Sequence, residues 1–181
     1  MDTSLHFLGL SATTTKSVKS TKSYHTETYD DGSSYEGEML GPLRHGKGKL
    51  AFADGTYYDG EWNQGKMAGY GILYYYNGFI AYEGEWSNNR FEGKGAMYNE
   101  HQSEKKTQLS QIIEDKTWTR YEGDFSHDRW HGTGKLFFSN GDEFYGDFKN
   151  DIIHGRGTYS KHTGEVISGE WRNNRMISQY F

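Results

Sequence analysis

The sequence predicts an all-β fold: an elongated, single-layer antiparallel sheet of stacked β-hairpins, twisted, with an aromatic groove. Three observations predict it. A Tyr-x-Gly motif recurs along the chain, a Gly-x-Gly element follows most copies, and Asp-Gly or Asn-Gly pairs lie between them. Self-similarity at a period of roughly 20–50 residues is the mark of a repeat array. An isolated hairpin is only marginally stable, so we expect the hairpins to stack into one sheet.

The composition fits a thin sheet better than a thick core. Hydrophobic residues make up only 33% of the 181 residues, whereas aromatic residues make up 17%, which argues against a disordered chain. Cysteine is absent, which excludes disulfides and thiolate metal sites and suits a reducing cytosol. The formal net charge of −5 disfavours nucleic acid as a partner, because phosphate binding requires a basic surface.

The first recurring element is Tyr-x-Gly, followed by an acidic residue and, in most copies, an aromatic one. The motif tyrosines step by 23, 24, 39 and 24 residues. They are Tyr35, Tyr58, Tyr82, Tyr121 and Tyr145, and Ser168 takes this position in a last copy. On this alignment the fifth copy lacks one residue before its glycine, and Met39 replaces the aromatic residue of the first copy.

A Gly-x-Gly element and a turn pair complete the repeat. The Gly-x-Gly elements begin at Gly46, Gly69, Gly93, Gly132 and Gly155. The turn pairs are Asp31-Gly32, Asp54-Gly55, Asn77-Gly78, Asn140-Gly141 and Thr163-Gly164. Asp-Gly and Asn-Gly favour type I′ hairpin turns, in which both central residues have a positive φ. We therefore expect type I′ turns at these pairs.

This order of elements resembles the MORN (membrane occupation and recognition nexus) repeat over about residues 29 to 176. The resemblance implies an array over residues 24–176, with about five full repeats and partial repeats at the ends, followed by a C-terminal end at residues 177–181. Residues 1–23, rich in Ser, Thr and Lys, are expected to form a flexible tail. Its apolar residues Leu5, Phe7, Leu8 and Leu10 leave open that it docks on a partner or on the chain's own groove.

The third repeat contains an insertion near residues 100–115, where its hairpin turn is expected. Leu109, Ile112 and Ile113 have the spacing of a short amphipathic helix. The apolar stripe of such a helix has two interpretations, as a cover for the sheet or as a recognition element for a partner.

Strand alternation separates each hairpin into two faces, because successive side chains point to opposite sides. The motif aromatic residues, the glycines and a core column share one face; the column is Leu50, Leu73, Met97, Leu136 and Tyr159. The other face carries acidic residues at Glu38, Glu61, Glu85, Asp124, Asp147 and Glu170. Basic residues lie on the partner strands at Lys47, Lys49, Lys94, Lys135 and Arg156. We interpret this second face as solvated and self-paired.

The aromatic face is the predicted partner-binding groove, since Tyr and Trp are the usual anchors of protein interfaces. The groove residues are Tyr58, Trp62, Tyr82, Trp86, Tyr121, Phe125, Tyr145, Phe148 and Trp171, with Tyr35 at the start of the array. The flanking loop residues are Met67, Phe91, Trp130 and Ile153, with Met176 at the end. These rings are expected both to stabilise the array and to bind a partner.

No catalytic, metal-binding or cofactor-binding residues are predicted. His45, His131 and His154 occupy equivalent repeat positions, which lie about 10 Å apart in successive hairpins and cannot converge on one metal. Nucleotide and nucleophile fingerprints are absent. In MORN-containing enzymes the catalytic domain is separate from the repeats, so we expect no enzyme here and no cofactor.

The favoured function is a protein-binding scaffold that takes a helix or an extended peptide. The family resemblance implies a cytoplasmic location in a cytoskeletal assembly, such as a cilium or flagellum with its axoneme. A less favoured alternative is a phosphoinositide-binding membrane tether, based on the basic loop residues Arg44, Lys66, Arg90, Arg129 and Arg175. Another alternative is a homotypic assembly unit, for example a homodimer.

Overall fold

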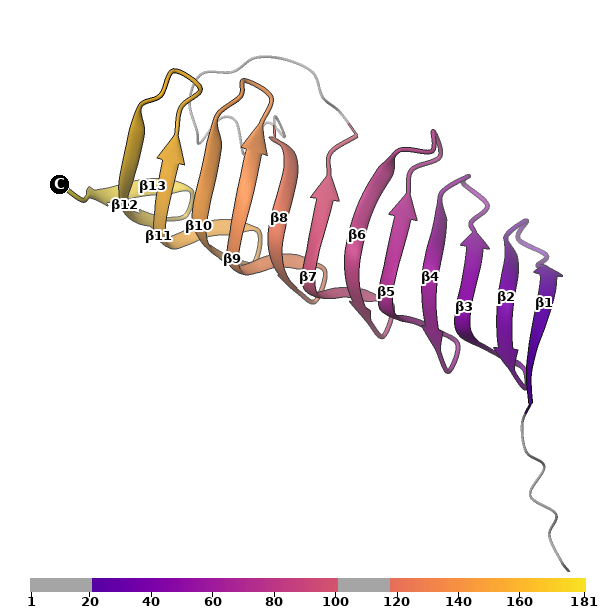
Figure 1. The fold of residues 1–181 in the computed structure, drawn as a ribbon. Coiled ribbons are helices and arrows are strands. Elements are labelled where there is room, and N and C mark those ends of the chain that lie inside the picture. The colour runs from indigo at the N-terminus through magenta and orange to yellow at the C-terminus, as the bar shows by residue number, and fades with distance from the viewer. Residues whose placement is uncertain (1–20, 101–117) are drawn as a thin grey trace, which may run out of the picture.

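The computed structural model describes residues 21–100 and 118–181 (Figure 1). In these residues thirteen strands form one antiparallel sheet, ordered as in the chain. They are β1 (Lys22–Thr28), β2 (Ser34–Leu40), β3 (Leu43–Ala51), β4 (Tyr57–Asn63), β5 (Lys66–Tyr74), β6 (Ile80–Ser87), β7 (Arg90–Tyr98), β8 (Trp118–Ser126), β9 (Arg129–Phe138), β10 (Glu143–Lys149), β11 (Ile152–Ser160), β12 (Val166–Arg172) and β13 (Arg175–Gln179). The prediction of an all-β, single-layer array of stacked hairpins is confirmed.

The paired strands extend slightly beyond the array expected from the repeats. The first strand begins at Lys22 and the last ends at Gln179, whereas the repeats indicated residues 24–176. Most of the expected tail lies outside the described residues, and so does the insertion with Leu109, Ile112 and Ile113. The part of the chain that the structure describes contains no helix long and apolar enough to span a membrane.

Turns of two kinds alternate along the sheet. The upper turns, at the top of Figure 1, join β1 to β2, β3 to β4, β5 to β6, β9 to β10 and β11 to β12. The lower turns, at the opposite edge, join β2 to β3, β4 to β5, β6 to β7, β8 to β9, β10 to β11 and β12 to β13. Because the strands pair in chain order, turns of one kind are two strands apart, about 10 Å in successive hairpins.

The Asp-Gly and Asn-Gly pairs lie in the upper turns, and the prediction that they form type I′ turns is wrong. Gly55 has a φ of 87°, but Asp54 does not share a positive φ. The Gly55 N–H donates to the Phe52 carbonyl at 3.0 Å, and the Phe52 N–H donates to the Thr56 carbonyl at 2.9 Å. This is the wider hairpin loop with one left-handed glycine, and the Asp54 carboxylate accepts the Thr56 N–H at 2.9 Å within it.

The type I′ turns are five of the six lower turns, which follow the motif aromatic residue. Asn88 and Asn89 have φ values of 53° and 67°, so both central residues are left-handed. Asn and Asp tolerate this region better than other non-glycine residues. The same conformation occurs at Gln64-Gly65, His127-Asp128, Asn150-Asp151 and Asn173-Asn174.

Each hairpin bends near its lower end. Gly84 pairs with Gly95 and Trp86 pairs with Phe91, so one residue of β6 lies opposite three of β7. The extra residues are accommodated at Gly93, whose φ is 76°. Bulges of this kind bend a strand and increase its twist. The lower ends of the hairpins therefore curl toward one side of the sheet, which we call the inner face (Figure 1).

Candidate partner-binding face

The inner face is covered by one continuous ladder of aromatic rings. In the central repeats the Tyr ring packs edge to face against the Trp or Phe of its own motif and against that of the next repeat. Tyr82, for example, lies 5.3 Å from Trp86 and 5.0 Å from Phe125, with interplanar angles near 90°. Such contacts continue in order through Tyr35, Trp62, Tyr58, Trp86, Tyr82, Phe125, Tyr121 and Phe148. Phe144 then links Phe148 to Trp171.

Glycine is required beneath these rings because the ring lies directly on the backbone. A Cβ at Gly95 would lie 2.7 Å from Cε2 of Tyr82, closer than van der Waals contact allows. A Cβ at Gly84 would also collide with the Gly95 backbone of the paired strand, at 2.5 Å. The ring and the glycine pair thus form one packed unit in each repeat.

Polar atoms of the rings are bonded to the backbone. The Tyr82 hydroxyl donates to the Glu85 carbonyl at 2.8 Å, and Nε1 of Trp86 donates to the Gly71 carbonyl of the preceding hairpin at 3.0 Å. Burial raises the pKa of Tyr35 to about 12 and also raises the pKa values of Tyr58, Tyr82 and Tyr121. These hydroxyls are therefore neutral donors whose function is to hold the bend of each hairpin.

Nearly all the predicted groove residues belong to this ladder, but as its buried floor. The exposed fraction is 0% for Tyr58, Tyr82 and Tyr121 and 6% for Trp86. Trp62, Phe125, Phe148 and Trp171 are buried to the same degree. A partner that binds the inner face would reach the side chains that lie on top of the rings and not the ring faces themselves.

The placement of Tyr145 on the aromatic face is wrong. Phe144 occupies the motif position and is fully buried, whereas Tyr145 lies on the opposite, outer face with 59% of its surface exposed. No residue is missing from this repeat, because Phe144 lies two residues before Gly146, as Tyr does in the other copies. Likewise Ile167, not Ser168, takes the motif position of the last copy, where it pairs with Tyr159.

The predicted flanking residues occupy an unexpected structural position. The Met67 N–H donates to Oδ1 of Asn89 at 2.8 Å, and the Asn89 N–H donates back to the Met67 carbonyl at 3.1 Å. The same two-bond clip joins Phe91 to Asp128, Trp130 to Asp151 and Ile153 to Asn174. Each lower turn is thereby clipped to the next. The recurring Asn or Asp as second turn residue was the signal for this clip in the sequence.

Accessible apolar surface on the inner face comes from a second set of side chains. These are partly exposed and pack against the buried rings; we call them the inner apolar row. The row consists of Tyr29, Phe52, Met67, Leu73, Phe91, Met97 and Trp118. It includes two of the predicted flanking residues, Met67 and Phe91, whereas Trp130 and Ile153 are buried.

The acidic column of the outer face has a structural function that its charge pattern did not reveal. Glu85 Oε1 accepts the Lys94 N–H at 3.1 Å, directly after the bulge glycine Gly93. Glu38, Asp124 and Asp147 bind the corresponding N–H groups of Lys47, Thr133 and Arg156. The carboxylates therefore stabilise the bends. Ion pairs across the face are sparse, with Lys94 to Asp124 at 2.5 Å as one example.

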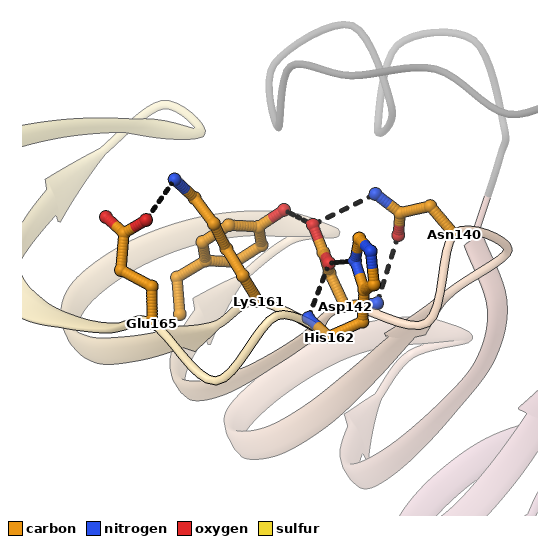
Figure 2. A network of polar contacts seen from close by, with 6 residues as sticks. Asn140, Asp142, Lys161, His162 and Glu165 are labelled. Carbon is orange, nitrogen blue, oxygen red and sulfur yellow. Dashed lines mark hydrogen bonds and ion pairs between the residues drawn. The ribbon is translucent and has the colours of Figure 1, made fainter.

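A buried carboxylate joins two upper turns near the C-terminal end of the sheet (Figure 2). Asp142 accepts hydrogen bonds from the Tyr159 hydroxyl and, at 2.9 Å, from the His162 N–H, and it also contacts Nδ1 of His162. Burial alone would raise its pKa, but these bonds and one from Asn140 hold the pKa of Asp142 below its ordinary value. Every group in this cluster is engaged in joining the turns, so we interpret it as structural.

No arrangement of metal ligands is formed by the described residues. His45, His131 and His154 lie on β3, β9 and β11, at equivalent positions of separate hairpins. Residues 21–100 and 118–181 contain no cluster of three or more His, Asp or Glu side chains able to hold a metal ion.

Comparison with known proteins agrees with the repeat architecture. The model of the MORN repeat matches residues 35–57, 58–79, 82–98, 121–143 and 144–166, together more than half of the chain. The chain is also similar to "Phosphatidylinositol 4-phosphate 5-kinase 1" of Oryza sativa subsp. japonica, with 44% identity over 46 residues. That match covers 25% of this chain and only 6% of the relative.

The matched segments start at Tyr35, Tyr58, Tyr82, Tyr121 and Phe144, which are the ring residues that the structure places over glycine in successive hairpins. MORN repeats are binding modules and are generally not catalytic. The chain belongs to the MORN-repeat family.

Proposed function

We propose that this protein is a non-enzymatic scaffold that binds a helix or an extended segment of a partner protein along the inner face of the sheet. The observation that carries this proposal is the inner apolar row, which lies on a rigid floor of buried rings and is covered by no second layer in the described residues. Partly exposed apolar side chains gathered on one face are typical of a protein-interaction site.

The geometry supports a long, thin ligand. Successive hairpins place equivalent row residues about 10 Å apart, and Met67 of β5 and Phe91 of β7 are such a pair beside neighbouring lower turns. A helix or extended peptide meets such a row at regular intervals. The ring floor is already fixed by packing and hydrogen bonds. Binding therefore costs little conformational entropy on this surface, which favours affinity.

The cellular setting belongs to the same proposal. The family resemblance supports a cytoplasmic protein of a cytoskeletal assembly, for example in a cilium or flagellum. A scaffold of this kind joins partners through surface contacts alone and needs no cofactor and no reaction.

Site-specific photo-crosslinking tests the binding face. A photoreactive phenylalanine analogue placed at Phe52 or at Met67 on the inner face should crosslink a partner from cell extract. The same analogue at Tyr70, which is 54% exposed on the outer face, is the control. Purified partner should then bind the Met67→Glu variant at least tenfold more weakly, about 1.4 kcal/mol, and the Tyr70→Glu variant with unchanged affinity.

Replacement of Trp86 or Phe125 is unsuitable for this purpose, because both rings are buried and their loss would unfold the hairpins. Adducts that form equally from Tyr70 would refute an inner-face site. If the analogue at Phe52 crosslinked the chain to a second copy of itself, the protein would be a homotypic assembly unit and not a scaffold for another protein.

A further inference from the structure

A row of basic side chains follows the lower turns. Lys66, Arg90, Arg129 and Arg175 each follow the two turn residues directly, and Lys149 and Arg172 directly precede two of these turns. All six are exposed. We call them the basic turn ridge. It differs from the basic loop set read from the sequence, because Arg44 lies one position further along its strand and contacts the Tyr29, Tyr35 and Trp62 rings.

The ridge has little internal neutralisation. None of its six side chains forms an ion pair with an acidic residue of the described chain. The lower turns contain two acidic residues, Asp128 and Asp151. One carboxylate oxygen of each accepts a backbone N–H, from Phe91 and from Trp130 respectively. The ridge therefore concentrates positive charge on one edge of a chain whose net charge is −5.

Three successive lower turns line an open polar hollow of about 440 Å³ along the ridge. Arg90 lines it from one turn, His127 and Arg129 from the next, and Asn150 from the third. Asp128 also lines the hollow, with Oδ1 bonded to the Phe91 N–H. The lining thus contains two guanidinium groups and an amide as hydrogen-bond donors, and Arg binds a carboxylate with two parallel hydrogen bonds.

We propose that the basic turn ridge binds a carboxylate-rich, extended segment of a partner protein, with one acidic side chain seated in the hollow between Arg90 and Arg129. This surface lies at the edge of the sheet and is separate from the inner apolar row. Cations recur about every 10 Å along the ridge, and an extended chain rises about 3.3 Å per residue, so an acidic segment meets one basic position per three residues or so.

Shape decides between this occupant and other anions. Adjacent strands of a sheet are rotated by about 20–25° relative to one another, so a flat membrane meets only a few of the lower turns at once, whereas an extended peptide follows the edge. Single-stranded nucleic acid needs aromatic rings for base stacking, and the lower turns within the described chain present none that is exposed.

Fluorescence anisotropy with a labelled oligoglutamate peptide tests the ridge on the full chain. At low salt, about 20 mM, the wild-type chain should bind the peptide, and binding should weaken steeply as salt rises. The Arg90→Glu/Arg129→Glu variant should bind at least tenfold more weakly. The Lys47→Glu/Arg156→Glu variant carries the same change in net charge on the outer face, and its affinity should stay within about twofold of wild type.

Equal loss in the two variants would show that only overall charge matters and would overturn the proposal. The proposal would also be overturned if the wild-type chain did not bind the peptide but sedimented with phosphatidylserine vesicles through Arg90 and Arg129. The ridge would then be a membrane contact. Circular dichroism of both variants verifies that they are folded. Neither outcome bears on the inner face, because neither variant changes the inner apolar row.

Discussion

At the scale of single residues, the ring over glycine is the unit on which the array is built. The Tyr82 ring contacts the backbone of Gly95 directly, and the hydroxyl reaches over it to the carbonyl of Glu85. Any side chain at Gly95 would separate the ring from the strand. The glycine and tyrosine columns are therefore one feature, although they lie far apart in the motif.

Gly95→Ala should destabilise the protein by about 1–3 kcal/mol, because the added methyl overpacks the contact with Tyr82. The control is Gly164→Ala in an upper turn, where a Cβ would meet nothing within 4 Å but φ is +94°. Its cost should be near the roughly 1–2 kcal/mol of a left-handed alanine alone. Urea unfolding measures both, and no effect at Gly95 would contradict the packing described.

Register is also decided at the residue scale. Tyr145 was assigned to the ring column because a tyrosine stands one residue before the motif glycine, yet strand alternation places Phe144 there. Phe144 pairs with Leu136 and Tyr159, two members of the core column. The period-two alternation of strand side chains, counted back from Gly146, predicts Phe144 at this position. The tyrosine at 145 resembled the motif residue and led to the wrong assignment.

At the scale of elements, clips join each lower turn to its neighbour. Asn89 supplies a side-chain oxygen and a backbone N–H to Met67, whereas Gly65 in the turn before it gives only its N–H to the Arg44 carbonyl. Asparagine suits this position because it accepts a positive φ and carries a hydrogen-bond acceptor.

Asn89→Gly keeps the left-handed backbone and removes the side-chain bond, so it should cost about 1 kcal/mol of unfolding free energy. Asn88→Gly is the matched control, since that side chain makes only exposed bonds to Lys66 and Ser87 and its loss should be nearly neutral. Hydrogen exchange of the Met67 amide should accelerate in the first variant alone. Equal effects of the two substitutions would mean that the clip contributes nothing.

The upper turns are joined by Asp142, whose contribution depends on pH. Its folded-state pKa lies below the ordinary carboxyl value of 3.8, so the folded protein favours the ionised form. This stabilisation is complete above pH 4 or so and is lost as the pH falls through the folded pKa. Asp142→Asn should lower the melting temperature at pH 7, and the difference from wild type should shrink as the pH falls below the ordinary carboxyl value of 3.8. A difference that is constant with pH would contradict the ionised clip.

At the scale of the whole molecule, stability is a sum over neighbouring hairpins that share one ring ladder. Contacts between strands are confined to neighbouring hairpins, since each strand pairs only with its neighbours in chain order. The hairpins are nevertheless coupled, because the motif rings Tyr58, Tyr82 and Tyr121 each pack between two repeats.

The buried tyrosines predict cooperative unfolding in alkali. Burial raises the pKa of Tyr35 to about 12, above the ordinary value of 10, and raises those of Tyr58, Tyr82 and Tyr121. The unfolded chain releases these protons first, so their stabilisation is complete below about pH 10 and is lost as the pH rises above it. Tyrosinate absorbance and circular dichroism should change together above pH 10. Ionisation of all tyrosines with an unchanged sheet would contradict this.

The sequence by itself determined the repeat, the all-β class, the order of the hairpins and the identity of most core residues, because these follow from period-two alternation and from glycines at fixed intervals. Only the tertiary structure decided which turns are type I′, which rings are buried and which side chains remain accessible. The physical reason is the bend at glycines such as Gly93, which curls each lower turn over the inner face. That bend buries Trp86 and Phe125, leaves Met67 and Phe91 partly exposed, and aligns the basic lower turns along one edge.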